Sequence, residues 1–559
     1  MGLKDLKIVG EDKLKRVFVS PKEIMWYGNG VKNADFLLKS AIHQVYVGIP
    51  EVAVLESTEN KKAALLIDFG SEIVGGLELI VSRNSGNKEG VRLHVRFGES
   101  VAEAMTPIAI KNATNDHAVR DMDIILSQYS QQSFAYTGFR FVYIELVDSD
   151  AWIEIANIRA ILTYRDIEYK GYFECSDSVL NQIFDVAAYT VHLNMQNELW
   201  DGIKRDRLVW IGDSHPEMLA IRSVFGDEHI IDDCLKFIAQ SNPIPQWPNH
   251  FTTYSFWYIL ILWDWYWYNG RKELILDLQQ YWVGLVTQLL SLVHHNEQEI
   301  ISEIDFEQGF FIDWQTKDTE EAKAGVYALL RLTLLAANKL CILVGNNDVA
   351  QECLKVADML KKQLLIHNGR KQIVALMSLA GLLDDNEVED VIVKDNANGM
   401  STFMSYYILS TITKTNGITD AINILKDYYG AMLDTGATTF WEDFDIKWSR
   451  PDARIDRILQ SDEYDIHGEN GRFCYQGLRH SLCHGWSAGP VAFLAEYVMG
   501  IQILDAGCKK IKIAPNLGPL SWVKGAYPTP YGLVKVQVEQ SNGRLSMHVD
   551  APKEIEVIK

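Results

Sequence analysis

The chain has 559 residues, which is enough for two to four domains and a large buried core. Its formal net charge of −21 opposes binding to phosphate backbones and anionic lipids, so neither a nucleic-acid nor a membrane partner is expected. The hydrophobic content of 48% and charged content of 23% are typical of a globular protein. Nine of the 15 tryptophans lie between Trp200 and Trp314, where a large core or a sugar-binding surface would use their flat faces.

Several functional classes lack their sequence signals. The most apolar run, Tyr254 to Tyr268, is too short to span a bilayer and contains Asp264. The N-terminus has no hydrophobic leader, so we expect a cytoplasmic protein, or an exported one whose leader has been removed. The seven cysteines form no CxxC pair and are expected to be free thiols. With no P-loop and no glycine-rich dinucleotide motif, neither a cofactor nor a metal is implied.

The first third of the chain has the alternation of β-strands. Short apolar or alternating runs are separated by Gly, Asn and Ser, a pattern that predicts an antiparallel β-sandwich ending near Tyr169. The expected strands are Ala63–Gly70, Gly76–Val81, Val91–Phe97, Phe139–Leu146 and Ile153–Tyr164.

Helical periodicity then takes over for about 330 residues. Many helices without intervening strands predict an α-α array, and the absence of a fixed repeat favours a closed toroid over an open solenoid. The expected helices are Val179–Val191, Met218–Val224, Ile230–Ala239, Phe256–Tyr268, Leu274–His294, Ala322–Val344, Asp348–Leu365, Lys371–Leu383, Met400–Thr413, Thr419–Met432 and Gly489–Leu504.

The tail after Asp505 alternates again. Strands are expected over Lys510–Ala514, Leu533–Val538 and Arg544–Val549, with a hairpin turn at Asn542-Gly543. A tail of this length is marginal alone, so it is expected to pack on the helices. The predicted domains are residues 1–169, 170–504 and 505–559.

The densest group of charges lies between Trp200 and Asp213. It holds three aspartates, three basic residues and two tryptophans among Leu, Val and Ile. A solvated loop with local ion pairs is the plain interpretation. The apolar neighbours favour a half-buried site, in which mutual repulsion would leave one carboxyl protonated and able to act as a general acid.

Two further groups follow in the second half. Gly436–Asp445 places Trp441, Glu442 and more acids among aromatic residues, either as caps of a helix or as the second carboxylate of a glycosidase. Ser481–Gly489 contains His484, Trp486 and a formal Gly-x-Ser-x-Gly match. An esterase is disfavoured because no strand is expected before that serine. His484 is either a structural histidine or one that orients a carboxylate or binds substrate.

At these three groups the chain resembles the α-L-rhamnosidases of glycoside hydrolase family 78. The family's first motif reads approximately DxxxRDERLGWTGD, and this chain has DGIKRDRLVWIGD, one residue shorter. The family's Trp-Glu pair and Ser-x-x-His match Trp441-Glu442 and Ser481 with His484. Phrases of the family's β domains are matched at 68–70, 97–100, 138–140 and 529–532, so the resemblance touches most of the chain.

The resemblance implies an (α/α)6 barrel between β domains and inverting hydrolysis of terminal α-L-rhamnosides. In such hydrolysis an acid protonates the leaving oxygen and a carboxylate activates water. Glu442 then matches the general base and Asp206 the general acid. Alternatively, the missing residue is the family's acidic Glu and Asp206 is the Asp before it. The resemblance implies that Asp201 and Asp213 bind sugar hydroxyls and that Trp210 forms a wall of the subsite. Arg205, Trp441, His484 and Trp486 are further candidates for binding the expected carbohydrate substrate.

Two other functions stay open. One is an (α/α)6 glycosidase for another sugar, and the other is a carbohydrate-binding protein without catalysis. The sequence leaves the oligomeric state undecided.

Overall fold

The computed structural model describes residues 7, 10, 12–86, 89–295, 301–304, 310–317, 319–460, 462–541 and 544–559. The chain forms two compact units. The first comprises residues 1–167 and 192–207, and the second comprises residues 168–191 and 208–559. The segment that carries the first motif, up to residue 207, therefore belongs to the first unit. The expected hairpin at 542–543 lies outside the described residues.

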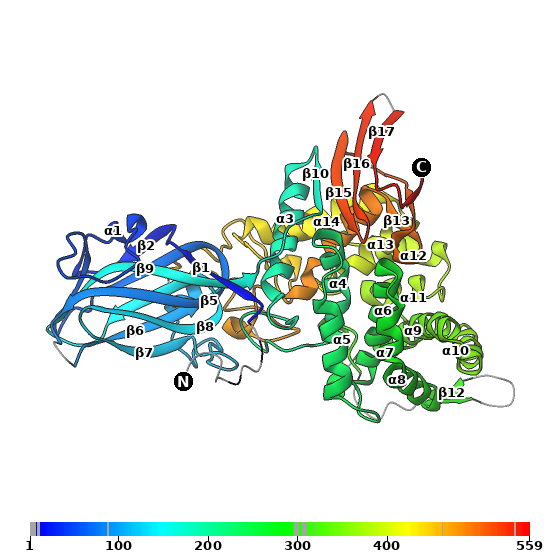
Figure 1. The fold of residues 1–559 in the computed structure, drawn as a ribbon, viewed down its shortest axis with the longest axis horizontal. Helices are drawn as coiled ribbons and strands as arrows, with labels where there is room; N and C mark the ends of the chain where they lie inside the picture. The colour runs from blue at the N-terminus through cyan, green and yellow to red at the C-terminus, as the bar shows by residue number, and fades with distance from the viewer. Residues whose placement is uncertain are drawn as a thin grey trace. The chain divides into compact units, whose positions relative to one another are not determined.

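The first unit is an antiparallel β-sandwich (Figure 1), as predicted. Its strands follow the order β3-β4-β9-β5-β8-β6-β7, with β1 on β9 and β2 on β5, and two short helices accompany them. The bounds are β1 Leu14–Val19, β2 Glu23–Tyr27, β3 Val31–Lys32, α1 Phe36–Lys39, β4 Ala53–Ser57, β5 Ala64–Asn84, β6 Val91–Gly98, α2 Val101–Met105, β7 Asp121–Leu126, β8 Ser130–Leu146 and β9 Ala151–Arg165.

Alternation explains most of these strands. Val91, Leu93, Val95 and Phe97 point into one core, while the residues between them are more exposed. The predicted break between Ala63–Gly70 and Gly76–Val81 is wrong, because β5 continues through both runs and bends at two irregularities in its pairing with β8. Gly75 permits the bend, since a Cβ there would lie 1.8 Å from a backbone oxygen of β9.

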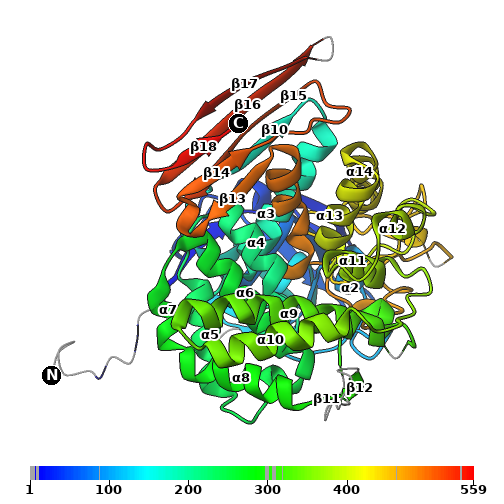
Figure 2. The same ribbon diagram turned by 90° about the vertical axis from the view of Figure 1, so that its right-hand side faces the viewer.

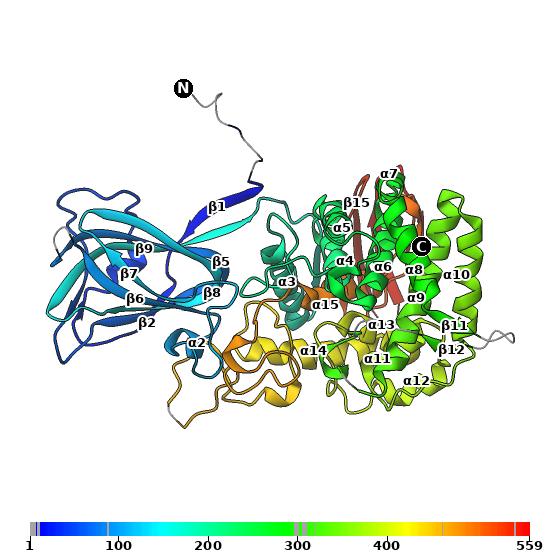
Figure 3. The same cartoon turned by 90° about the horizontal axis from the view of Figure 1, so that it is seen from below.

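The second unit begins with β10 (Tyr172–Cys175) and continues as helices. Among the described residues, six helices contact one another in a closed ring: α4 contacts α6, then α9, α11, α13 and α15 follow, and α15 returns to α4. The other helices alternate with these along the chain (Figure 3). The bounds are α3 Ser178–Asn194, α4 Ser214–Val224, α5 Ile230–Ser241, α6 Thr252–Asn269, α7 Lys272–Asp277, α8 Gln279–Ser291, α9 Ala322–Val344, α10 Asn347–Leu360, α11 Lys371–Leu379, α12 Asp385–Ile392, α13 Ser405–Thr415, α14 Ile418–Asp434 and α15 Gly489–Phe493.

Burial separates the ring from the outer helices. Every residue of α4 is buried, whereas α10 buries only one face, at Ala350, Cys353, Val356 and positions one turn further on. The alternation of inner and outer helices along a closed ring is the (α/α)6 barrel expected from the sequence. α9 is long and apolar enough to cross a membrane, but 67% of its apolar window is buried inside the structure, as in the core helix of a globular protein.

Three helix predictions need correction. The expected helix over Leu274–His294 is interrupted at Leu278 and divides into α7 and α8. The one over Gly489–Leu504 ends as a π-turn at Leu494–Val498, and its last residues form a strand, because they pair with the chain that follows. α12 was not expected, since it has only eight residues, of which two are buried.

Two small sheets complete the second unit (Figure 2). One has the order β10-β15-β16-β17, so a strand from the start of the unit pairs with the tail, and the other has the order β13-β14-β18. They contact α4, α6 and the π-turn, so the tail packs on the barrel as expected. The bounds are β11 Val293–His295, β12 Ile301–Ile304, β13 Ile501–Asp505, β14 Lys510–Ile513, β15 Trp522–Thr529, β16 Gly532–Ser541, β17 Arg544–Asp550 and β18 Glu556–Ile558.

Candidate active site

The first motif lies in the sandwich unit and is largely buried there. Asp201 and Arg205 are each 2% exposed, so a solvated loop is the wrong interpretation of this part. Lys204 is fully buried and pairs with Glu103 at 2.9 Å. A buried cation needs such a partner because its desolvation is costly. The segment is therefore fixed in place by charge pairing inside its own unit.

Asp206 follows directly and is held by two neighbours. Its Oδ1 accepts a hydrogen bond from Nη1 of Arg205 at 3.1 Å and lies 3.5 Å from Nε2 of His117. Asp206 and Arg207 both have left-handed backbone angles, with φ of 52° and 55°. Consecutive non-glycine residues in this region are strained, a feature that clusters at functional sites. Arg207 stabilises the turn by donating to the backbone oxygen of Tyr136 at 2.7 Å.

The end of the motif lies in the barrel unit. Asp213 is the residue before α4, and its Oδ2 lies 3.0 Å from Nε2 of His484, a residue 271 positions further along the chain. Both side chains are buried. The hydroxyl of Tyr254 is 3.5 Å from the other Asp213 oxygen, and the Trp210 ring packs edge-on against Tyr254. The 3.0 Å contact supports the interpretation in which His484 orients a carboxylate, and that carboxylate is Asp213.

Glu442 lies on the loop after α14, and its backbone is fixed on both sides. Its N–H donates to the backbone oxygen of Ser481 at 3.1 Å. Its own carbonyl accepts from Oγ1 of Thr402 at 2.6 Å and from Nε1 of Trp486 at 2.8 Å. The residue is only 3% exposed. Two separate segments of the barrel, one at Thr402 and one at 481–486, thus fix the backbone that carries this carboxylate.

Two more acids accompany Glu442. Burial, followed by repulsion from Asp313 and Glu442, holds the pKa of Asp443 well above its usual range. Burial also raises the pKa of Asp313 to about 6, although Ser401 donates to that carboxylate at 2.5 Å. A protonated Asp443 adds no negative charge beside Glu442. The arrangement therefore gathers several carboxyls without requiring all of them to ionise together.

Aromatic rings border these acids. Trp486 stacks on Phe403 with ring centres 4.7 Å apart, and it also contacts His484. Phe311 lies parallel to Trp486 at 6.5 Å. Trp441 is buried like these rings, and it packs edge-on against Phe444 and His480.

The third motif has no nucleophile elbow. Ser487 is buried and donates to the backbone oxygen of His484 at 2.6 Å. It belongs to a short 3-10 turn, Gly485–Ala488, rather than to a strand-to-helix turn. These features agree with the expectation against an esterase.

The barrel unit brings together six of the residues predicted from the sequence: Trp210, Asp213, Trp441, Glu442, His484 and Trp486. Asp201, Arg205 and Asp206 belong to the sandwich unit. Sequence reasoning did not select Asp313, Asp443 or Tyr254. Asp313 had a usable signal, because it lies in the run Phe310-Phe311-Ile312-Asp313-Trp314, where an acid stands among aromatic residues as at Glu442.

One group of side chains has the composition of a metal site. Ligand atoms of Glu442, Cys474 and His480 lie within 4.8 Å of one another. One ring nitrogen of His480, Nε2, accepts the backbone N–H of Asp443 at 3.1 Å. Metal binding through that nitrogen would cost this hydrogen bond, so the geometry gives no support for a resident ion.

Two parts of the chain are similar in sequence to domains of known proteins. Residues 168–352 match the model of the bacterial alpha-L-rhamnosidase 6 hairpin glycosidase domain, and residues 500–558 match the bacterial alpha-L-rhamnosidase C-terminal domain. An alpha-L-rhamnosidase of Formosa agariphila is 29% identical over 157 residues, which are 27% of this chain and 16% of that protein. The chain thus spans a small part of this curated relative.

Solved structures share the fold. A family 78 rhamnosidase of Bacillus is 22% identical, with a TM-score of 0.73 over 94% of this chain and 55% of that one. A Klebsiella oxytoca rhamnosidase solved with rhamnose bound is 20% identical, with a TM-score of 0.67 over 86% of this chain and 96% of that one. The expected fold, a six-hairpin barrel with β domains before and after it, is confirmed. Residues 168–352 and 500–558 thus resemble two domains of bacterial alpha-L-rhamnosidases, and the chain has the fold of solved rhamnosidases.

Proposed function

We propose that this protein is an inverting glycoside hydrolase that releases terminal α-L-rhamnose, or a similar deoxy-sugar, from glycosides or glycans. The observation that carries the proposal is the buried carboxylate set around Glu442, in a barrel whose residues 168–352 match a rhamnosidase glycosidase domain. The proposal keeps the division into a sandwich (1–169), a catalytic barrel (170–504) and a C-terminal β domain (505–559).

In this mechanism Glu442 is the general base. It takes a proton from the water that attacks the anomeric carbon on the face opposite the leaving group. Thr402 and Trp486 hold its backbone, so the carboxylate is oriented before substrate arrives. The raised pKa of Asp443 favours its neutral form. Less negative charge then lies beside Glu442 when Asp313 is ionised.

Asp206 is the proposed general acid, which protonates the glycosidic oxygen as the bond breaks. Its strained backbone and its contact with Arg205 keep the carboxyl in a defined orientation. The sugar hydroxyls are bound by Asp201, Arg205, Asp213 and His484, and the rings of Trp210 and Trp486 contact the sugar face. For Trp441 we propose a supporting role next to Glu442, because its ring packs against Phe444 and His480.

Asp206 also supports a second candidate function, a protein that binds rhamnosides without cleaving them. The motif is one residue shorter than the family's, and Oδ1 of Asp206 is already engaged by Arg205 and His117. A glycosidase of the same fold acting on another sugar is the remaining alternative, and it is separated from the main proposal by substrate choice.

A panel of aryl glycosides tests these proposals. We expect hydrolysis of the α-L-rhamnoside, and we expect Glu442→Gln to lower kcat by at least about 100-fold, the usual contribution of a general base. Asp206→Asn should lower kcat more strongly as the leaving group becomes more basic, because protonation by the acid matters most there. Asp445→Asn, three residues from Glu442, is the matched control and should keep nearly full activity.

The outcomes separate the candidates. Rhamnoside binding without turnover in the wild-type chain would favour the binding protein, and selective turnover of another glycoside would change the substrate. Equal loss for all leaving groups in Asp206→Asn would assign the acid to another residue. NMR of the first-formed anomer tests the stereochemistry, and net retention would reject water activation by Glu442.

A further inference from the structure

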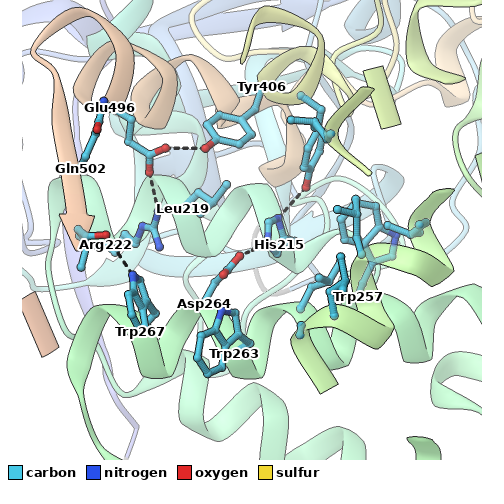
Figure 4. Close-up of a pocket in the computed structure, with 18 of the residues that line it drawn as sticks. His215, Leu219, Arg222, Trp257, Trp263, Asp264, Trp267, Tyr406, Glu496 and Gln502 are labelled. Atoms are coloured by element: carbon cyan, nitrogen blue, oxygen red, sulfur yellow. Dashed lines mark hydrogen bonds and ion pairs between the residues drawn. The ribbon is translucent and has the colours of Figure 1, made fainter. Parts of the chain in front are cut away.

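A cavity lies inside the ring of helices, and we call it the axial cavity. It is lined by residues other than those of the candidate active site. It has a volume of about 560 Å³ and is lined by the ring helices α4, α6, α9, α11 and α13 and by β13 (Figure 4). Asp213 precedes the first residue of α4, whereas the cavity contacts that helix at His215, Leu219 and Arg222.

One wall of the cavity holds a fixed ion pair. Nη2 of Arg222 donates to Oε1 of Glu496 at 2.5 Å, and the hydroxyl of Tyr406 donates to Oε2 at 2.5 Å. The Arg222 and Glu496 side chains are 9% and 16% exposed. Figure 4 shows Glu496 between its two partners. A carboxylate oxygen has more than one lone pair, so this fixed group can still accept from a ligand hydroxyl.

The other wall holds a second polar chain. Nε2 of His215 lies 2.9 Å from Oδ2 of Asp264, and Nδ1 lies 2.6 Å from the hydroxyl of Tyr407. The His215 ring contacts the rings of Trp257 and Tyr407, with ring centres 5.4 and 5.8 Å away, so its position is fixed by two neighbours. The Asp264 side chain is 33% exposed, which makes its carboxylate accessible from the cavity.

Flat apolar surface lies beside these polar groups. Trp263 and Trp267 on α6 stack with ring centres 5.4 Å apart, and both are partly exposed. Within this helix, Trp257 and Trp265 are core residues, whereas Trp263 and Trp267 are not fully buried. Lys339 lies 5.1 Å from the centre of the Trp263 ring. Trp267 is anchored by a hydrogen bond from Nε1 to the backbone oxygen of Ile503 at 3.1 Å.

The charges of the lining groups balance. Among the described lining residues, Asp264 and Glu496 carry negative charge, and Arg222 and Lys339 carry positive charge, so with a neutral His215 the formal sum is zero. A charged ligand would add a net charge that the lining groups do not balance. An apolar ligand would remove water from the four charged side chains without replacing its hydrogen bonds. A neutral ligand with many hydroxyls would meet donors and acceptors of both kinds.

We propose that this axial cavity binds a neutral saccharide of one or two rings, at a site separate from catalysis. The volume is that of ordinary small-ligand sites, which combine apolar walls with a few fixed polar groups. The sugar's C–H face would pack on the partly exposed surface of the stacked Trp263–Trp267 pair, and its hydroxyls would bind Asp264 and Glu496. This inference does not depend on the proposed hydrolase activity.

Isothermal titration of the full chain tests this site with L-rhamnose, D-glucose and cellobiose as neutral probes and with galacturonate and glucosamine as charged ones. Trp263→Ala removes a partly exposed platform and should weaken neutral-sugar binding by at least about tenfold. Asp213→Asn, in the candidate active site, is the counterpart that should leave axial binding unchanged. Leu364→Ala, a 98% exposed residue, is the control for handling and folding.

Binding of a neutral sugar that is lost in Trp263→Ala and kept in Asp213→Asn supports the inference. The reverse pattern, or binding of none of the neutral probes, overturns it. Binding of a charged probe that is tighter than that of the neutral sugars and is lost in Trp263→Ala also overturns the inference. A site whose lining charges sum to zero should not prefer a charged sugar. If Trp263→Ala melts earlier than the wild-type chain, Trp263→Phe keeps an aromatic face and should retain binding, and loss of binding in that folded variant counts against the site.

Discussion

The two hydrogen bonds to the Glu442 carbonyl predict a measurable coupling between Thr402 and Trp486. Thr402→Val and Trp486→Phe each remove one donor but leave the other, so each lost bond should cost about 1 kcal/mol in the free energy of unfolding. Trp486→Phe also loses ring contacts with Phe403 and His484, which adds about 1–2 kcal/mol. In the double variant the buried carbonyl loses both donors, and its desolvation penalty of about 1–3 kcal/mol appears in full.

The assay is urea unfolding of the four proteins, analysed as a double-mutant cycle. The double variant should be less stable than the sum of the single losses by about 1–2 kcal/mol. Packing losses in either single variant cancel in the cycle, so the coupling reports the shared acceptor. A coupling within about 0.5 kcal/mol of zero would refute the idea that these donors act on one carbonyl.

Three further predictions concern other parts of the second unit. Because burial raises the folded pKa of Asp313 to about 6, the folded state holds a proton that the unfolded state releases, so stability should fall as pH rises from about 4 to 6. In Asp313→Asn this part of the slope, of the order of 3 kcal/mol in total, should vanish from pH-dependent unfolding curves. Gly485→Ala would place a Cβ 1.8 Å from Oε1 of Glu217, so it should lower stability by about 1–3 kcal/mol, and thermal melting should show partial recovery when Glu217→Ala is added. A thiol reagent should label about one cysteine in the native chain, Cys474, and all seven after denaturation. The other six thiols are buried, and burial raises the pKa of four of them to about 11 or 12, namely Cys175, Cys341, Cys353 and Cys508. Rapid labelling of several thiols in the native chain would contradict this prediction.

Local periodicity was sufficient for much of the fold. The alternation at Val91–Phe97 predicts β6 because strand side chains alternate between core and solvent, whatever lies elsewhere in the chain. Local periodicity failed where pairing with another strand decides the structure. Ile501–Asp505 carries an apolar pattern compatible with a helix, and it becomes a strand because Lys510–Ile513 is available to pair with it.

The candidate site divides in the same way. Glu442 stands out locally, as an acid among aromatic residues. Asp313 has a similar setting, yet what makes it distinctive is its burial against Ser401, 88 positions away, which no local pattern encodes. The pairing of Asp213 with His484 spans 271 positions and depends on closure of the helical ring. Sequence therefore indicates which segments carry the chemistry, and the fold decides which of their side chains meet.

Closing the ring also creates an electrostatic problem, since it buries Asp213, Asp313, Glu442 and Asp443 in one region. Four adjacent buried charges of one sign would oppose folding strongly. The three other acids have different surroundings: Asp213 has His484 as a partner, Asp313 accepts a hydrogen bond from Ser401, and burial holds the pKa of Asp443 well above its usual range. The three acids come from different inner segments of the barrel. Because these acids are independent in the chain, removing any one should perturb the pH profile of activity without displacing Glu442, whose backbone has its own fixed contacts.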